Sequence, residues 1–201
     1  MFLIKKDKNK RGFSLIELLV SVGVFTVITS IILANHARFG GDILVSNLAY
    51  DVALSIRQSQ LFGLSVREFK LTGGGGRFDI GYGVHLSTSD LTSYIIYADF
   101  NGDKAYQSGA DEIEETFNLR QGFKIKKFCA TQTGGTEDCS DVGAISTLNL
   151  TFVRPDPDAT ISVNGSIISY RSARIVLESS QGTQRSVLIE STGQISIPTG
   201  S

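Results

Sequence analysis

The chain has 201 residues, and its 19 Lys and Arg residues nearly balance its 20 Asp and Glu residues, giving a net charge of −1. This balance argues against bulk nucleic-acid binding, and the length allows one domain beyond a terminal helix. Glycine is frequent at 21 residues, proline is scarce at 3 and tryptophan is absent, which favours many turns between short strands over a helical bundle.

An apolar run follows directly after a basic N-terminus. Five Lys and Arg residues lie between Lys5 and Arg11 against the single acid Asp7, and Phe13 to Leu33 carries one charge, Glu17. At about 1.5 Å per residue, a helix of that length spans roughly 31 Å, the thickness of a bilayer's hydrocarbon core. We therefore predict a transmembrane helix over residues 13–34 in a single-pass protein of the inner or cytoplasmic membrane. Basic flanks stay cytoplasmic, so everything beyond about Asn35 is expected outside the cytoplasm.

A cleaved secretory signal peptide is the alternative interpretation of this run. Such a peptide ends in a small-x-small cleavage site after its apolar region. Here the apolar run is long, and Asn35 to Phe39 (NHARF) makes a poor site of that kind.

The residues Arg11 to Leu19 (RGFSLIELL) resemble the type III signal of type IV prepilins and pseudopilins. In that family a membrane peptidase cuts after the glycine and methylates the new terminal amine. The resemblance implies that residues 1–12 are a leader removed after Gly12, that Phe13 becomes N-methylphenylalanine, and that Glu17 is the family's acid at the fifth mature position. It implies a prepilin peptidase/methyltransferase, the membrane and other pilins as partners.

Glu17 is unusual on physical grounds as well. A carboxylate inside a membrane span costs a few kcal/mol, so such groups are usually paired or functional. Glu17 could lie near enough to the cytoplasmic interface to stay hydrated. In the other interpretation it faces the amine of a neighbouring subunit's Phe13 in a filament and sets the axial register.

Two glycines, Gly40 and Gly41, follow the apolar run and weaken a helix by about 1 kcal/mol each, so we expect a kink or short unwound stretch there. Helical periodicity returns from Asp42 to Phe62, so residues 35–63 are predicted as an amphipathic continuation. Its apolar stripe is Leu44, Leu48, Val52 and Ile56, widened by Val45 and Ala49. Its polar face is Asn47, Tyr50, Asp51, Arg57, Gln58 and Gln60.

Residues 64–201 are predicted to form an external, β-rich domain. Alternation from Phe78 to Leu86 indicates a strand with one buried face. The other candidate strands are 65–71, 94–100, 115–119, 122–129, 147–153, 160–163, 173–178, 185–190 and 194–197, with turns at 72–77, 179–183 and 191–193. Many strands after one long helix predict an α+β fold, in which the helix packs on an antiparallel sheet.

The order of the predicted elements, a long N-terminal helix followed by many short strands, resembles that of the GspH/FimT family of minor pseudopilins and minor pilins. The similarity lies in the segment Asn47 to Gln60, in a mid-chain loop, Asp99 to Asp103, and in the final strand pair around Ser191 to Gly193. It implies a type IV pilin-like fold with the helix packed on the sheet domain.

The loop from Asp99 collects oxygen ligands of the kind that Ca²⁺ prefers. The candidate ligands are Asp99, Asn101, Asp103, Asp111 and Glu112. Compared with an EF-hand loop, positions one, three and five match, but Gly102 comes two residues early and Ala110 holds the twelfth position. A polar hairpin tip without metal explains the same residues through turn geometry.

Cys129 and Cys139 are the two cysteines, and both lie in the part predicted to be external. A disulfide between them would stabilise the fold by about 2–3 kcal/mol. Free thiols are the alternative, and two cysteines without clustered histidines cannot complete a zinc shell.

The sequence offers little support for a catalytic role. The histidines are His36, at the membrane exit, and His85, expected on the exposed face of a strand, and neither belongs to a nucleophile motif. Gly73 to Gly76 lacks the Lys and Ser/Thr of a phosphate-binding loop. We expect no enzymatic activity and no cofactor apart from the candidate calcium.

Three function classes are therefore compared: a filament subunit of a type IV pilus or type II secretion pseudopilus, a binding module on such a filament, and an anchored enzyme. We favour the filament subunit. DNA-binding members of the family carry a Gly-Arg-x-Arg pattern on the last hairpin, whereas this chain has Gly193 to Ser196 (GQIS). Both arginines are missing, so nucleic-acid binding loses its electrostatic support.

Overall fold

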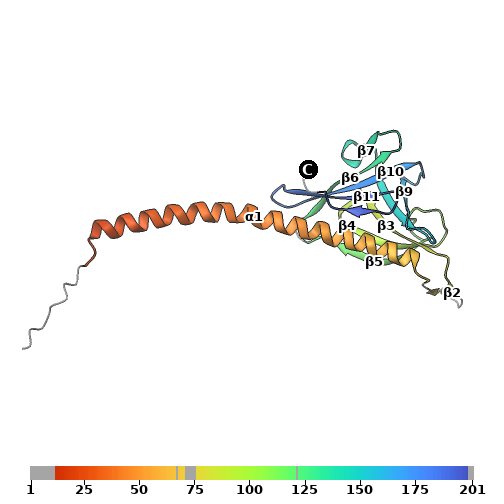
Figure 1. The fold of residues 1–201 in the computed structure, drawn as a ribbon, viewed down its shortest axis with the longest axis horizontal. Helices are drawn as coiled ribbons and strands as arrows, with labels where there is room; N and C mark the ends of the chain where they lie inside the picture. The colour runs from red at the N-terminus through yellow and green to blue at the C-terminus, as the bar shows by residue number, and fades with distance from the viewer. Residues whose placement is uncertain (1–11, 67, 71–75, 121, 199–201) are drawn as a thin grey trace, which may run out of the picture. The chain divides into compact units, whose positions relative to one another are not determined.

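The computed structural model describes residues 12–66, 68–70, 76–120 and 122–198, with side chains described throughout these ranges except at 34–40, 69, 70 and 112. The chain divides into two units, Met1–Gly40 and Gly41–Ser201. One helix, α1 (Leu15–Leu64), contributes residues to both units (Figure 1). The predicted leader, residues 1–12, lies outside the described part except for Gly12.

The expectation of an unwound stretch at Gly40 and Gly41 is wrong, because α1 remains helical through both residues. Gly41 is buried, and a Cβ at this position would lie 3.4 Å from Cγ of Gln181. The glycine therefore lets the turn at 179–183 approach the helix closely. This packing and the neighbouring helical turns offset the modest cost of two glycines.

The part of α1 from Gly41 to Leu64 buries one face, as the periodicity predicts. Val45, Ala49, Val52 and Ile56 are at most 2% exposed. Two assignments along this helix are wrong: Leu44, placed on the inner stripe, is 44% exposed, and Gln60, placed on the polar face, is buried. The inner face is centred on the line of Val45 and Val52, which turns Leu44 outward and Gln60 inward.

Within the described residues, the strands form two antiparallel five-stranded sheets and one short hairpin (Figure 1). The first sheet has the order β12-β11-β10-β6-β7, and the second has the order β5-β4-β3-β8-β9. The strand bounds are β3 Gly81–Ser87, β4 Asp90–Asp99, β5 Glu112–Asn118, β6 Lys124–Gln132, β7 Glu137–Cys139, β8 Thr147–Phe152, β9 Ala159–Val163, β10 Tyr170–Glu178, β11 Gln184–Glu190 and β12 Ile195–Ser196, with a 3-10 turn, η1, at Ser140–Val142. The hairpin pairs β1 (Phe69–Lys70) with β2 (Gly76–Arg77). Of the connection predicted at 72–77, residues 72–75 lie outside the described residues, and the assignment of Gly76 and Arg77 to it is wrong because both belong to β2.

One apolar core joins the helix to both sheets. It contains Ile56 from α1, Leu86 from the second sheet and Phe128 from the first sheet, all at most 1% exposed. The α+β antiparallel fold is therefore confirmed. The division into two sheets was not predicted, because alternation identifies strands but does not tell which of them pair.

Gln60 ties the end of α1 to two loops of the β domain. Its Nε2 donates to the carbonyls of Pro157 and Gly193, at 2.8 and 3.1 Å, and its Oε1 accepts from Arg57 at 2.6 Å. Gly193 has φ +79°, and a Cβ there would overlap the Pro157 carbonyl. The buried amide thus donates to the carbonyl of the buried Gly193 and to that of Pro157, and so joins the two loops.

We predict that Gln60→Leu lowers the free energy of unfolding by about 2–3 kcal/mol, because it leaves these carbonyls without a donor. Urea denaturation of the purified chain, followed by circular dichroism, measures the change. Gln58→Leu is the matched control, since Gln58 makes one long hydrogen bond to Glu115 at 3.3 Å and should change stability by no more than about 0.5 kcal/mol. Equal effects of the two variants would contradict the role given to Gln60.

Candidate functional site

The residues at the predicted cleavage position lie just before α1. Gly12 and Ser14 are exposed and precede the helix, and the side chain of Phe13 is 80% exposed. A Cβ at Gly12 would meet no atom within 4 Å. Within the described residues, the predicted cleavage position is therefore exposed on both sides of the bond between Gly12 and Phe13.

The polar side chains of the apolar run are satisfied within the helix itself. The hydroxyls of Ser21, Thr26, Thr29 and Ser30 donate to backbone carbonyls three or four residues earlier, at 2.7–2.9 Å. Their hydrogen-bonding groups are therefore turned onto the backbone, and the helix presents a nearly apolar surface. Glu17, in the first turn, is the one charged residue from Leu15 to Leu33.

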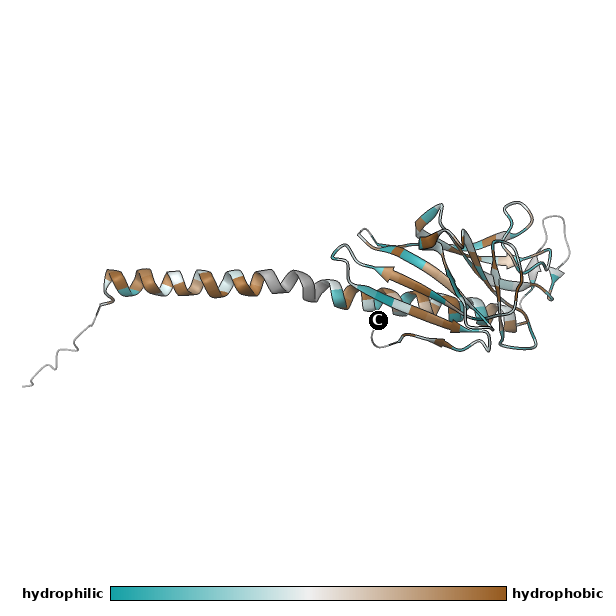
Figure 2. Cartoon of the chain, turned by 90° about the horizontal axis from the view of Figure 1, so that it is seen from above, coloured by the Kyte–Doolittle hydropathy of each residue, from teal (hydrophilic) through white to brown (hydrophobic). Residues whose placement is uncertain are grey.

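That apolar surface lies open on all sides of the helix. The large apolar side chains of this run are between 52% and 80% exposed, and Figure 2 colours the segment largely brown. Residues Leu15–Leu33 are long and apolar enough to cross a membrane, judged by length and composition. Such a surface requires lipid or other apolar helices around it.

The loop after β4 brings three of the five candidate calcium ligands together. Carboxylate oxygens of Asp99, Asp103 and Asp111 lie within 4.8 Å of one another. Burial, and then the charges of Asp111 and Asp103, raise the pKa of Asp99 above its ordinary value. Asn101 is turned toward Asp103, whose backbone N–H donates to its Oδ1 at 3.0 Å, and the side chain of Glu112 lies outside the described part.

Backbone N–H groups hold the same carboxylates in place. Asp99 accepts from Gly102 at 2.8 Å and from Lys104 at 3.0 Å. Asp111 accepts from Phe100 at 3.0 Å and from Gln107 at 2.8 Å. Lys104 has φ +62° and is the sixth residue counted from Asp99, the position at which EF-hand loops turn sharply through glycine.

His85 lies under this loop, so its predicted place on an open strand face is wrong. The ring Nδ1 donates to Oδ1 of Asn149 at 2.7 Å, and the ring of Tyr106 lies 4.8 Å away, centroid to centroid. Asn149 also accepts from the backbone N–H of Tyr106, at 3.2 Å. The alternation places Val84 and Leu86 correctly on the buried face, but it gives no sign that a distant loop covers the outer face. Its assignment of Phe78 to the buried face is wrong, because Phe78 precedes β3 and is 47% exposed. The side chain of His36 is not described.

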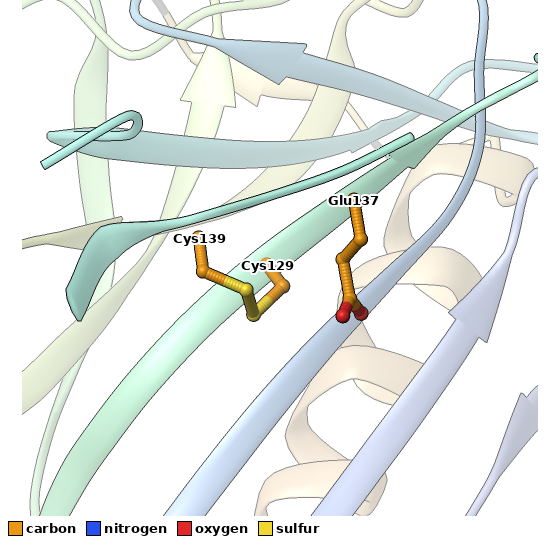
Figure 3. Close-up of side chains that lie close together, drawn as sticks. All are labelled: Cys129, Glu137 and Cys139. Carbon is orange, nitrogen blue, oxygen red and sulfur yellow. A yellow bond between two sulfur atoms is a disulfide. The ribbon is translucent and has the colours of Figure 1, made fainter. Parts of the chain in front are cut away.

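Cys129 and Cys139 are joined in a disulfide between directly opposed residues of β6 and β7 (Figure 3). Glu137 lies beside the pair and bonds to Arg174. Both sulfur atoms are used in the disulfide, so this group is not a set of metal donors. The strand β7, which the sequence did not reveal, holds Cys139 opposite Cys129.

Comparison with known families gives one match: residues 7–33 fit the prokaryotic N-terminal methylation motif. The match covers residues 7–12 of the predicted leader, the cleavage position and the apolar helix, and it supports a type IV pilin-like protein that a prepilin peptidase processes. The exposed apolar helix fits a single-pass, membrane-anchored protein of this kind. No curated protein and no solved structure matches the chain.

The burial of His85 predicts a pH dependence of stability. Burial lowers its pKa below 6.5, and the hydrogen bond to Asn149 opposes this only in part. As pH falls through about 6.5, the unfolded chain takes up the proton before the folded chain does, so the free energy of unfolding decreases. The contribution of the neutral His85 side chain to the free energy of unfolding is fully present above that pH.

Urea denaturation at about pH 7.5 and about pH 5.5, chosen to bracket the ordinary histidine pKa, measures the effect. We expect the wild-type chain to lose stability at the lower pH and His85→Gln to lose less. The same pH dependence in both proteins would exclude His85 as the cause.

Proposed function

We propose that the chain is a minor pilin or pseudopilin subunit. After cleavage behind Gly12 and methylation of Phe13, it assembles through its N-terminal helix into a type IV pilus or type II secretion pseudopilus. The observation that carries the proposal is the uncovered apolar helix, with one acid in its first turn, inside the matched methylation motif. Its apolar surface is accommodated by lipid before assembly and by neighbouring helices afterwards.

Glu17 has a specific role in this proposal. In the apolar interior of a filament its carboxylate requires a positive partner, and the new terminal amine of a neighbouring Phe13 supplies one. Glu17 follows Phe13 by four positions in the chain, so pairing between subunits fixes their axial offset. Uniform apolar side chains could not select a single register.

A DNA-binding module on the filament is less well supported. Beyond Gly12 the chain holds 14 Lys and Arg residues against 19 Asp and Glu residues, an acidic excess. The arginines that could form a patch are Arg171, Arg174 and Arg185. Arg171 is exposed, but Arg174 is bonded to Glu137, and Arg185 donates to Ser46 and to the Gln184 carbonyl. Phosphate binding requires free basic groups, so these contacts weigh against it.

Membership of the GspH/FimT family is proposed on the fold as well as on sequence. The segment Asn47 to Gln60 packs on the β domain, and the last two strands, β11 and β12, form a hairpin closed at Gly193. These are the parts of the chain on which the resemblance rests.

A structural calcium ion in the acidic loop is a second proposal. Three carboxylates lie within reach of one centre, and each oxygen that accepts an N–H keeps a second lone pair for a cation. The left-handed turn at Lys104 completes the likeness to an EF-hand loop, and Asp111 follows directly after the twelfth position. The ion would hold the loop over His85 and the second sheet.

We predict that Glu17→Leu is cleaved and methylated like the parent chain, and inserted into the membrane, but does not enter filaments. Mass spectrometry of the N-terminus checks processing, and the amount of the chain in the sheared filament fraction checks assembly. Ser21→Leu is a matched control, because it adds an apolar side chain one turn along the same helix without removing a charge. Normal filament entry by Glu17→Leu would show that the pairing role is wrong.

For the loop, we predict that about 1 mM Ca²⁺ raises the melting temperature of the full chain in detergent by about 2–4 °C relative to EDTA. Asp103→Asn should lose this shift, whereas Asp156→Asn should keep it, since Asp156 is exposed and lies outside the cluster. An unchanged melting temperature of the wild-type chain would leave the loop as a hydrogen-bonded turn without metal.

A further inference from the structure

The loop after β4, residues 101–110, covers polar side chains on the outer face of the second sheet. The covered side chains are His85 of β3, Tyr97 of β4, and Asn149 and Thr151 of β8. Tyr97 and Thr151 are fully buried, and their hydroxyls hydrogen-bond to each other at 2.8 Å. Asn149 is 2% exposed. The loop therefore rests on a polar layer, on the side of the sheet that faces away from the apolar core.

Polar and aromatic contacts hold the loop on this layer. The backbone N–H of Tyr106 donates to Oδ1 of Asn149 at 3.2 Å, and Oγ1 of Thr151 donates to the carbonyl of Lys104 at 3.1 Å. The ring of Tyr106 lies 4.8 Å from that of His85, centroid to centroid. Within residues 101–110, Ala105 is the one buried residue. Lifting the loop therefore exposes little apolar surface, so it costs less free energy than separating the strands.

The backbone of the loop also favours opening. Lys104 has φ +62°, a left-handed conformation that residues other than glycine rarely adopt. Such a conformation persists only where surrounding contacts impose it. Here the N–H of Lys104 donates to Asp99, and its carbonyl accepts from Thr151. Release from the sheet removes the second contact and lets this residue relax.

His85 is the titratable group beneath the loop. The groups that face it are the ring of Tyr106 from the loop and the amide of Asn149 from β8, and the ring of Tyr97 from β4 lies beyond Tyr106. All three are uncharged near neutral pH. Burial lowers the pKa of His85, and neither Lys104 nor the carboxylates of the loop offset this effect. A proton on His85 therefore creates an unpaired charge under the closed loop.

We propose that residues 101–110 form a proton-operated lid. When His85 takes up a proton, the lid lifts off the second sheet and water hydrates the imidazolium, while β3 and β8 stay paired. Opening takes up at most one proton, so its equilibrium constant rises by at most tenfold per unit of pH. The lid opens more often below about pH 6.5, the ordinary pKa of histidine, and the polar face of the second sheet is then accessible.

Hydrogen exchange of the full chain in detergent tests the lid. The N–H of Tyr106 reports opening, because Asn149 accepts it, and the N–H groups of β3 and β8 report unfolding of the domain. After correction for the intrinsic pH dependence of exchange, the protection of Tyr106 should fall about fivefold to tenfold from about pH 7.5 to about pH 5.5. At both values it should lie at least about a hundredfold below the protection of the strands. EDTA in the buffer makes the result independent of any bound calcium.

Variants of His85 and Tyr106 separate the lid from other causes. The chain has two histidines, so His36→Gln is the matched control, which should keep the pH response that His85→Gln loses. Tyr106→Phe keeps the covering ring and the response, whereas Tyr106→Ala should leave the N–H of residue 106 weakly protected at both pH values. The same response in His85→Gln and the parent, or equal protection of Tyr106 and the strands, would overturn the proposal. If His85→Gln does not fold, equal protection of residue 106 in the Phe and Ala variants would overturn it instead.

Discussion

The packing of the inward face of α1 against both sheets is the constraint on which the rest of the β domain depends. Val45, Ala49, Val52 and Ile56 contribute to a core that contains strands from each sheet. Without this helix face, the two sheets would leave a wide apolar opening. Gly41 and Gln60 determine how closely the helix lies at its two ends, one by lacking a side chain and the other by donating to two loop carbonyls.

Residue patterns predict the parts of this protein that are governed by local chemistry. The apolar run with its single acid and the alternating strands can be predicted from the sequence because apolar residues in them are contiguous or recur within a few positions. The two-sheet order, the strand β7 and the covering of His85 depend on contacts between distant segments. Tyr106 and Asn149 carry no local signal of their role; they matter because a loop from β4 folds over the second sheet. The pattern places Gln60 wrongly because a polar residue on a helix is ordinarily solvated, whereas here its buried side chain donates to two loop carbonyls.

Local satisfaction of polar groups recurs throughout the chain. In the apolar run, hydroxyls bond back to the helix; in the acidic loop, the carboxylates of Asp99 and Asp111 accept backbone N–H groups. Each segment nevertheless keeps one concentration of negative charge that these hydrogen bonds do not neutralise. For the helix it is the charge of Glu17 in an apolar surface, and for the loop it is the mutual repulsion of three carboxylates. In the two proposals, an amine of a neighbouring subunit meets the first feature and a bound cation meets the second.

Processing changes the electrostatics that hold the helix in place. The leader carries five basic residues against one acid, and in the proposed function this charge retains the N-terminus on the cytoplasmic side. In the proposed function, cleavage behind Gly12 removes this block and leaves one terminal amine close to Glu17. A helix without its basic flank is held in lipid mainly by apolar contacts, which neighbouring apolar helices can replace. The acid and the amine are then the remaining charges near the end of the helix, and satisfying each by the other between subunits favours the filament over the isolated chain in the membrane.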